Sequence, residues 1–275
     1  MSKTVLITGT SSGIGQAAVQ YFSENGWNVA ATMRSPEKDE TLKNLKNVKV
    51  YKLDVTDEVS IQNAINQTIS DFGAIDVVVN NAGYGAVGIF EKATNAQIQK
   101  QFDTNVFGVM NVVRQILPYF RKQKNGTIIN VTSIGGLVTF PIYSVYHGTK
   151  WAVEGWSEAL SHELRPLGIK VKNVEPGAIK TEFYEGSMDL FKNDSIKDYD
   201  NYEKVTYANT QQAGADAPGP IVVAKVIFKA ANDDNFRLRY AVGAETKFFL
   251  FLRRILPNNW FFGAVRMIVE KGFKK

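Results

Sequence analysis

The chain has 275 residues, a net charge of +5, no cysteine and two histidines. The lack of cysteine excludes disulfides, thiolate metal sites and cysteine nucleophiles, and two histidines argue against a histidine metal site or a Ser-His-Asp triad. No stretch approaches the roughly 18 to 20 apolar residues that cross a bilayer, and the N-terminus has no secretion-signal pattern. We therefore expect a cytoplasmic protein without a metal ion.

Seven short runs rich in β-branched residues alternate with longer stretches of helical periodicity. The strands are expected at residues 4–9, 28–33, 48–55, 75–83, 126–133, 169–177 and 239–243. The helices that follow the first, third and fourth runs are expected to end near Asn25, Phe72 and Phe120, and another begins just before Tyr146. Parallel strands need crossover helices, so this order predicts an α/β fold: one doubly wound domain with a seven-stranded parallel sheet and helices on both faces. Such folds bind ligands beyond the carboxyl ends of their strands.

Two segments interrupt this alternation. Residues 183–220 are polar, rich in Tyr and Asp and weakly periodic, which fits either an irregular substrate lid or a partly disordered surface excursion. Residues 244–275 form a basic, aromatic extension, and from Arg237 onward nine Lys and Arg face two Glu. This composition suits an anionic membrane surface, a subunit contact or a lid over an apolar pocket. The interpretation we favour is a C-terminal helix pair packed on the domain or on a second subunit.

A glycine-rich motif, TGTSSGIG, lies between the first strand and the first helix. Glycines there permit a tight turn and close approach to a pyrophosphate, while the helix N-terminus offers free N–H groups to the anion. The motif predicts dinucleotide binding by Gly9, Ser11, Ser12, Gly13, Ile14 and Gly15.

Polar or basic residues follow the next three strands. Met33 stands where an NAD-selective fold usually has an acid, and Arg34 follows it, which favours the 2′-phosphate of NADP, although a plain surface arginine is the alternative. Asp54 is placed to accept from the adenine amino group. The remaining cofactor candidates at these strand ends are Val55, Asn81, Ala82 and Gly83. Asp, Asn and Gly are also common turn formers, so turn chemistry is the competing interpretation.

Tyr146 and Lys150 are four residues apart in a predicted helix, so both side chains leave the same face. Carbonyl reduction by hydride needs a group that exchanges a proton at the substrate oxygen. A tyrosine serves if a nearby ammonium favours its phenolate. The alternative is a simple hydrogen-bonded or surface pair.

Taken together, TGTSSGIG, NNAG, DTNVFGV, NVTSIGG, YHGTK and VEPGAIKTEF resemble the short-chain dehydrogenase/reductase family over residues 3–185. The resemblance implies a Rossmann-like fold and a catalytic set of Asn105, Ser133, Tyr146 and Lys150. By this resemblance, Ser133 stabilises the negative charge on the substrate oxygen, and Lys150 also holds the nicotinamide ribose. Asn105 either holds a water of the proton relay or marks a helix distortion. It further implies cofactor contacts from Pro176, Gly177, Ile179 and Thr181. Many NADP-dependent relatives have a basic residue where this chain has Ser12, which weakens the case for NADP.

The closest resemblance within the family is to enzymes of steroids, retinoids and other lipophilic alcohols and ketones. It places the substrate among Ser133, Gly135, Tyr143, Tyr146 and Phe183. Thr132 and His147 are expected to have structural roles, because adjacent side chains of a strand or helix project elsewhere. Relatives are commonly homodimers or homotetramers, and no nucleic-acid partner is expected. The alternative function is a non-catalytic NADP-binding redox sensor, against which the complete catalytic set argues.

Overall fold

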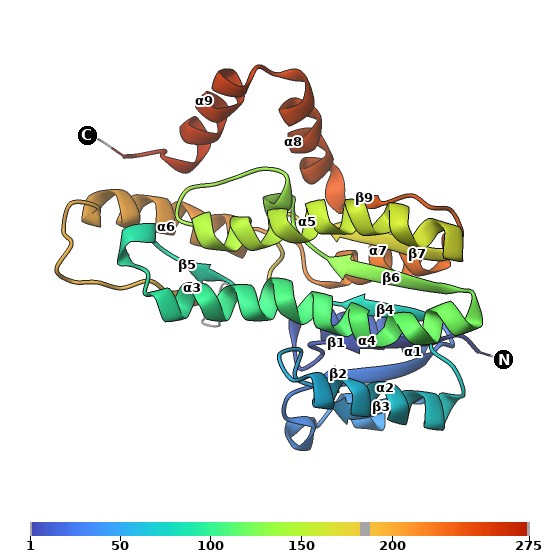
Figure 1. Cartoon of the computed structure of the whole chain (residues 1–275). Helices are drawn as coiled ribbons and strands as arrows, with labels where there is room; N and C mark the ends of the chain where they lie inside the picture. The colour runs from blue at the N-terminus through green and yellow to red at the C-terminus, as the bar shows by residue number, and fades with distance from the viewer. Residues whose placement is uncertain (1, 182–187, 274–275) are drawn as a thin grey trace.

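The computed structural model describes residues 2–181 and 188–273 and contains the predicted seven-stranded parallel sheet (Figure 1). Its strand order is β3-β2-β1-β4-β6-β7-β9. The strands are β1 Thr4–Thr8, β2 Asn28–Met33, β3 Val48–Lys52, β4 Val77–Asn80, β6 Gly126–Val131, β7 Ile169–Glu175 and β9 Arg239–Ala241. Because the chain crosses from β3 back past β1 to β4, the sheet has a topological switch point between β1 and β4, where doubly wound folds bind ligands.

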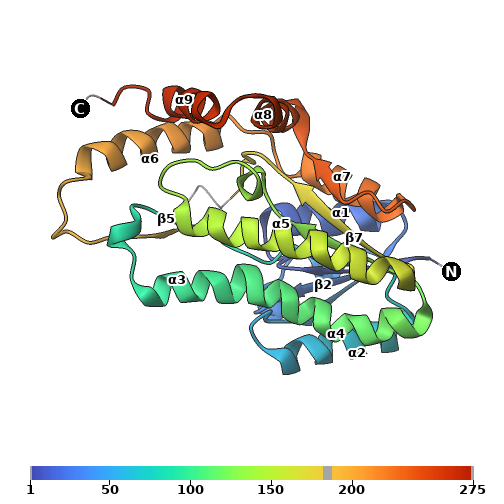
Figure 2. The same ribbon diagram turned by 45° about the horizontal axis from the view of Figure 1, so that its top comes forward.

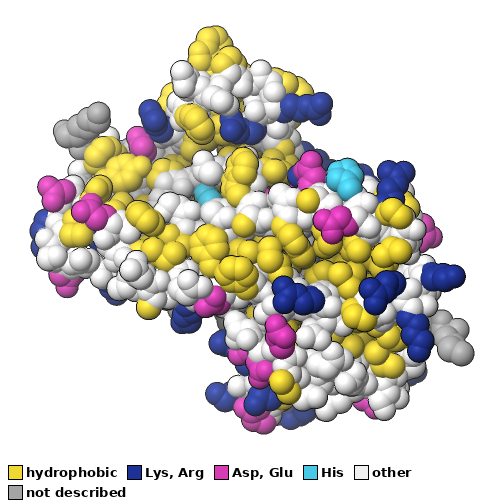
Figure 3. All heavy atoms as spheres, in the orientation of Figure 1, with side chains coloured by type: hydrophobic (Ala, Val, Ile, Leu, Met, Phe, Trp, Pro, Cys, Tyr) yellow, Lys and Arg dark blue, Asp and Glu magenta, His cyan; other side chains and the backbone are white. Residues whose placement is uncertain are grey.

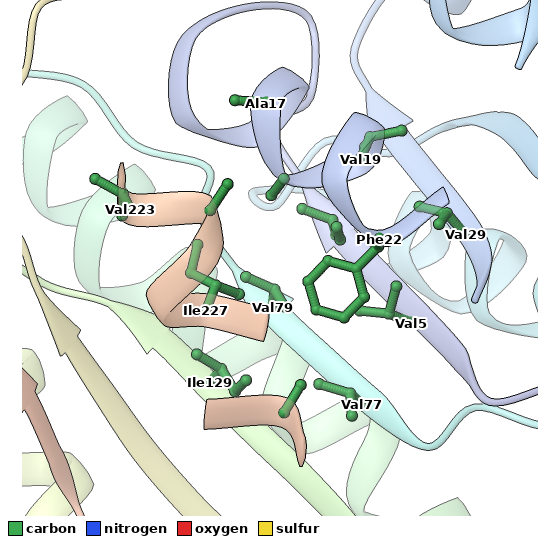
Figure 4. Packing of buried hydrophobic residues seen from close by; sticks show 14 of the residues in the cluster. Val5, Ala17, Val19, Phe22, Val29, Val77, Val79, Ile129, Val223 and Ile227 are labelled. Atoms are coloured by element: carbon green, nitrogen blue, oxygen red, sulfur yellow. The ribbon is translucent and has the colours of Figure 1, made fainter. Parts of the chain in front are cut away.

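Helices cover both faces of the sheet. On one face lie α1 Gly13–Glu24 and α7 Ile221–Asn232, and on the other α2 Glu58–Phe72, α4 Gly108–Gln123 and α5 Ser144–Leu164. Alternate side chains of a strand point to opposite faces, so Val5 and Ile7 join the first core and Leu6 the second. Phe22 is the largest fully buried side chain of the first core, and it packs among Val5 and residues of helix α7 (Figure 4). The predicted doubly wound architecture is confirmed.

The long helix expected before residue 120 is interrupted. Helix α3, Asn95–Phe102, passes through a π-helical turn at Asp103–Phe107 before α4 begins. Asn105 lies in this turn and is buried. The helix distortion that was expected at Asn105 is present.

The segment after residue 187 is more regular than its sequence indicates. A two-stranded parallel pair joins β5, Ala86–Val87, to β8, Asp189–Leu190, and α6 occupies Asp200–Ala215. The expectation of an irregular segment was therefore wrong for α6. The reason is that polar contacts hold this helix: buried Lys92 pairs with Asp200 at 3.2 Å and Glu203 at 2.7 Å. An apolar stripe, the signal on which periodicity depends, is not needed there.

The C-terminal extension forms two helices, α8 Gly243–Ile255 and α9 Asn258–Val269, which we call the C-terminal hairpin (residues 243–269). Phe261 and Val265 of α9 are buried against Ile134 and Val138, so the predicted packing of a helix pair on the domain is confirmed. Figure 2 shows α9 beside α6, and Asn209 of α6 donates a 2.8 Å hydrogen bond to the carbonyl of Val269. Within the described part of the chain, no helix has the length and apolarity that a membrane crossing requires.

Candidate active site

A cavity of about 1860 Å³ opens at the carboxyl ends of the strands. Sites for small molecules usually have about 300 to 1000 Å³, so this cavity has room for a dinucleotide and a substrate together. Its walls come from the β1–α1 turn, the ends of β2 to β7, and helices α5, α6, α8 and α9.

The glycine turn at the bottom of the cavity is shaped by close backbone approach. Gly9 and Gly13 have φ values of +68° and +58°, which favour glycine. A Cβ on Gly15 would lie 2.2 Å from the carbonyl oxygen of Gly9. Asn81 fixes the turn by donating from Nδ2 to the carbonyls of Thr8 and Gly9, both at 2.9 Å. The result is a cradle with the N-terminus of α1 directed into it, which fits a pyrophosphate.

The strand ends beside this cradle carry the other expected cofactor residues. Arg34 is exposed at the cavity rim, and buried Met33 precedes it. Asp54 also lines the cavity, but its Oδ1 accepts from the backbone N–H and the hydroxyl of Thr56 at 2.9 and 2.8 Å. This oxygen therefore makes the turn contacts that were the competing interpretation.

Helix α5 brings Tyr146 and Lys150 into the cavity wall, as their spacing predicts. The ammonium of Lys150 donates to the carbonyl of Val131 at 3.1 Å and lies 5.7 Å from the centre of the Tyr146 ring. Burial lowers the pKa of Lys150 to about 8, and the nearby carboxylate of Glu154 opposes that shift. A positive charge this close favours the phenolate form of Tyr146.

Ser133 follows β6 and faces the same space. Its Oγ accepts from the N–H of Gly135 at 3.0 Å and lies 3.5 Å from the carbonyl oxygen of Pro176. The neighbouring Thr132 points the other way and donates to Glu154 at 2.6 Å. Thr132 therefore has the structural contacts expected of it, and Ser133 keeps a hydroxyl at the cavity wall.

Asn105 lies behind the wall rather than in it. Its Nδ2 donates to the carbonyl of Tyr84 at 2.9 Å and to Thr149 Oγ1 at 3.3 Å, and its Oδ1 accepts from the N–H of Tyr84 at 3.1 Å. A Cβ on Gly83 would come within 3.1 Å of that Oδ1. Asn105 therefore fastens the chain after β4 to helix α5.

The end of the cavity around Tyr146 is aromatic. His147 is buried, stacks on Tyr143 with ring centres 5.5 Å apart, and accepts from the N–H of Phe140 through Nδ1 at 3.2 Å. Burial lowers the pKa of His147 to about 4, so the ring is neutral near pH 7. A Cβ on Gly135 would lie 2.6 Å from this ring, which explains glycine there. His147 has packing contacts, as expected, but it also lines the cavity.

A buried charge cluster below Lys150 was not identified from the sequence. Glu154 accepts from Asn173 at 2.8 Å and from Arg239 Nε at 3.2 Å, and Glu175 Oε1 lies 3.4 Å from the same Nε. Glu154 follows Lys150 by four residues on α5. That repeated spacing was the available signal, because it continues the face that Tyr146 and Lys150 share.

A family model described as short chain dehydrogenase matches residues 3–189 of the chain. The chain belongs to the short-chain dehydrogenase family. An uncharacterized oxidoreductase of Schizosaccharomyces pombe is 42% identical over 236 residues, covering 85% of this chain and 98% of that protein. A 3-ketodihydrosphingosine reductase of Bacteroides thetaiotaomicron is 44% identical over 179 residues, 65% of each chain. The solved structure of ElxO with NADP bound is 32% identical, has a TM-score of 0.73 and covers 88% of this chain and 97% of its own.

Membership in the family makes the protein an NAD(P)-dependent oxidoreductase. Most of the residues expected from the motifs line this cavity: Gly9, Ser11, Ser12, Gly13, Ile14, Arg34, Asp54, Val55, Asn81, Ala82, Gly83, Ser133, Gly135, Tyr143, Tyr146, Lys150, Pro176, Gly177, Ile179 and Thr181. Gly15 and Asn105 lie behind its wall, and Phe183 falls outside the described residues. No group of His, Asp or Glu suited to a metal ion occurs among residues 2–181 and 188–273.

The sequence motifs missed the part of the wall contributed by the C-terminal half of the dehydrogenase. Asn209, Thr210 and Ala213 of α6 line the cavity, as do Phe249 of α8 and Ile268 of α9. A lid over an apolar pocket was one interpretation of the aromatic extension, but its sequence does not indicate which side chains turn inward.

Proposed function

We propose that this dehydrogenase uses NADP(H) to interconvert a lipophilic ketone or aldehyde and its alcohol, with Tyr146 exchanging the proton. One observation carries the proposal: Tyr146, Lys150 and Ser133 converge on a single cavity whose other end is the glycine cradle. A redox sensor that only binds the cofactor would not need this convergence.

The residues divide the chemistry among them. A bound nicotinamide supplies or accepts the hydride at the substrate carbon. Tyr146 donates its proton to the developing alkoxide, or accepts it in the reverse direction. Ser133 donates a hydrogen bond to the same oxygen and stabilises its charge. Lys150 stabilises the phenolate form of Tyr146 and is expected to hold the nicotinamide ribose. Asn105 links the end of β4 to α5 through its hydrogen bonds and is proposed to support the proton relay.

Selectivity for NADP is assigned to a side pocket of about 410 Å³ at the end of β2. Arg34, Lys38, Ser11, Ser35 and Thr41 line it, so two cations and three hydroxyls are available to a ribose phosphate. Glu40 also lines the pocket, and its carboxylate pairs with Lys43 at 3.2 Å. Asp39, in the same pocket, is already engaged by the N–H groups of Leu42 and Lys43. The NADP bound to ElxO, a relative at 32% identity, also supports this preference.

A lipophilic substrate is supported by the wall around Tyr146. Phe140, Tyr143, Met188 and Phe249 line that end of the cavity, and the related 3-ketodihydrosphingosine reductase is named for a long-chain ketone. Residues 183–220 would then act as a substrate lid, since α6 lies over the cavity.

Assembly into a homodimer or homotetramer through α4 and α5 is also proposed. Trp151 of α5 is 42% exposed, and the proposal has this side chain covered by a second subunit. Light scattering on wild type and Trp151→Glu should show an oligomer that the variant weakens, and a monomeric wild type would remove this part of the proposal.

The function is tested by NADPH and NADH oxidation across long-chain ketones, steroid ketones, retinal and short polar aldehydes. We expect turnover with NADPH that improves with substrate apolarity. Arg34→Ala should raise the KM for NADPH about ten-fold and leave that for NADH unchanged. Arg165→Ala is the matched control, because Arg165 is exposed and lies outside both the cavity and the side pocket. Tight NADPH binding without turnover on any compound would instead support the sensor.

A further inference from the structure

The C-terminal hairpin has a second apolar face that its packing does not explain. Its inner face is covered: Phe261 and Val265 pack on the loop after β6, and Phe249 faces the cavity. Seven of the fourteen large hydrophobic side chains that are exposed in the described residues lie within this hairpin: Phe248, Phe251, Ile255, Trp260, Phe262, Met267 and Ile268, the last of which also lines the cavity. About a tenth of the chain thus carries half of its exposed apolar groups, a concentration that marks an interaction surface.

The exposed groups follow the helical period on α8. Phe248, Phe251 and Ile255 are spaced i, i+3 and i+7, so they form one stripe, and each is more than half exposed. Lys247 and Arg254 flank the stripe and are also exposed. On α9, Trp260 and Met267 are 71% and 76% exposed. Figure 3 shows apolar side chains at the outer end of the projecting hairpin, with basic side chains on its flanks.

Charge distinguishes between the partners that such a surface could take. Residues 244–275 contain seven Lys and Arg against two Glu, a net charge of +5 that equals the charge of the whole chain. A second copy of the hairpin would bring two strongly basic surfaces together. An anionic bilayer offers both an apolar interior for the aromatic stripe and negative headgroups for its basic flanks.

We propose that the C-terminal hairpin docks the enzyme on an anionic lipid surface, with the outer face of α8 and Trp260 of α9 inserted among the headgroups. Phe249 and Ile268 line the cavity from the same two helices, so docking turns this side of the cavity toward the bilayer. Delivery of substrate from the membrane rests on the lipophilic substrate of the proposed function, whereas docking rests on the hairpin surface itself.

Sedimentation of the full-length protein with vesicles tests the docking. Wild type should pellet with phosphatidylcholine vesicles that contain about a third phosphatidylserine and remain in the supernatant with phosphatidylcholine alone. Near 1 M salt, where the screening length falls to about 3 Å, binding to the anionic vesicles should drop at least ten-fold.

Surface variants separate docking from folding and from catalysis. The double variant Phe248→Ser/Phe251→Ser should bind anionic vesicles at least ten-fold more weakly, because its apolar stripe is lost. Neither residue lines the cavity, so NADPH oxidation with a water-soluble carbonyl compound should be unchanged without vesicles. The control is Val59→Ser/Phe90→Ser, which removes side chains that are 69% and 61% exposed outside the hairpin and should bind like wild type.

Two results would overturn the inference. One is equal recovery of wild type in the supernatant with both kinds of vesicle. The other is a concentration-dependent dimer that Phe248→Ser/Phe251→Ser abolishes while vesicle binding is absent, which would make the hairpin a subunit contact. Failure of turnover on every carbonyl compound would overturn the proposed function and leave the vesicle result standing.

Discussion

Replacing Glu175 by glutamine is expected to stabilise the protein, and to do so most at alkaline pH. Glu175 ends β7, is 1% exposed and lies next to the cavity residue Pro176. Arg239 is its nearby cation, but that guanidinium also pairs with Glu154 at 3.2 Å and Glu158 at 2.7 Å. Burial, together with the charge of Glu154, raises the pKa of Glu175 to about 8.

The sign follows from the two pKa values. An unfolded chain releases the Glu175 proton near 4.5, and the folded protein holds it up to about 8. Between these values the folded state binds more protons, so this group makes the protein less stable as the pH rises. At about 1.4 kcal/mol per pH unit, the ionisation of Glu175 lowers the free energy of unfolding by at most about 5 kcal/mol above pH 8. Near pH 5 the same effect is only about 1 kcal/mol.

Urea denaturation of wild type and Glu175→Gln near pH 5, 7 and 8.5 measures this difference. The variant's advantage over wild type in free energy of unfolding should be at least about 2 kcal/mol larger at pH 8.5 than at pH 5. Glu158→Gln is the matched control, because Glu158 shares Arg239 but is 53% exposed, and it should show no such gain. A Glu175→Gln variant that is less stable than wild type at pH 8.5 would refute the reasoning.

Three further changes probe the cavity. Gly15→Ala should abolish NADPH binding measured by fluorescence, because its Cβ would meet the Gly9 carbonyl at 2.2 Å; Gly263→Ala, where the added Cβ would meet no described atom beyond its own helix backbone and chain neighbours within 4 Å, should bind normally. Asn105→Ala should lower the free energy of unfolding by about 1 to 3 kcal/mol, because the N–H of Tyr84 loses its acceptor and the carbonyl of Tyr84 keeps only Gln101 as a donor; an unchanged urea midpoint would contradict this role. Glu154→Gln should move the alkaline limb of the kcat/KM profile to lower pH, because the carboxylate raises the pKa of Lys150, and an unmoved limb would contradict that coupling.

The sequence was sufficient for the sheet, the glycine turn and the helix that carries Tyr146 and Lys150, because each depends on local signals. Runs of β-branched residues identify the strands, and the glycines, which take positive φ values in the structure, identify the turn. The four-residue spacing of Tyr146 and Lys150 identifies the helix face that they share. These features are fixed by neighbours in the chain, so periodicity and motif position locate them.

What the sequence did not indicate depends on contacts between distant segments. Helix α6 has no apolar stripe of its own that periodicity could detect. It is held by Lys92, which lies 108 residues before its partner Asp200 in the chain. The cluster around Arg239 joins α5, β7 and β9, and only the topology brings these together. The hairpin's inward and outward faces are likewise both apolar, so its sequence could not show which one covers the cavity.

The most direct test of the central claim compares wild type with Tyr146→Phe for NADPH binding and for NADPH oxidation with a long-chain ketone. The substitution removes one hydroxyl and keeps the ring that lines the cavity. We predict unchanged NADPH affinity and a fall in kcat of at least a hundred-fold, the usual contribution of a positioned acid. Turnover that survives in the variant would contradict the assignment of Tyr146 as the group that exchanges the proton.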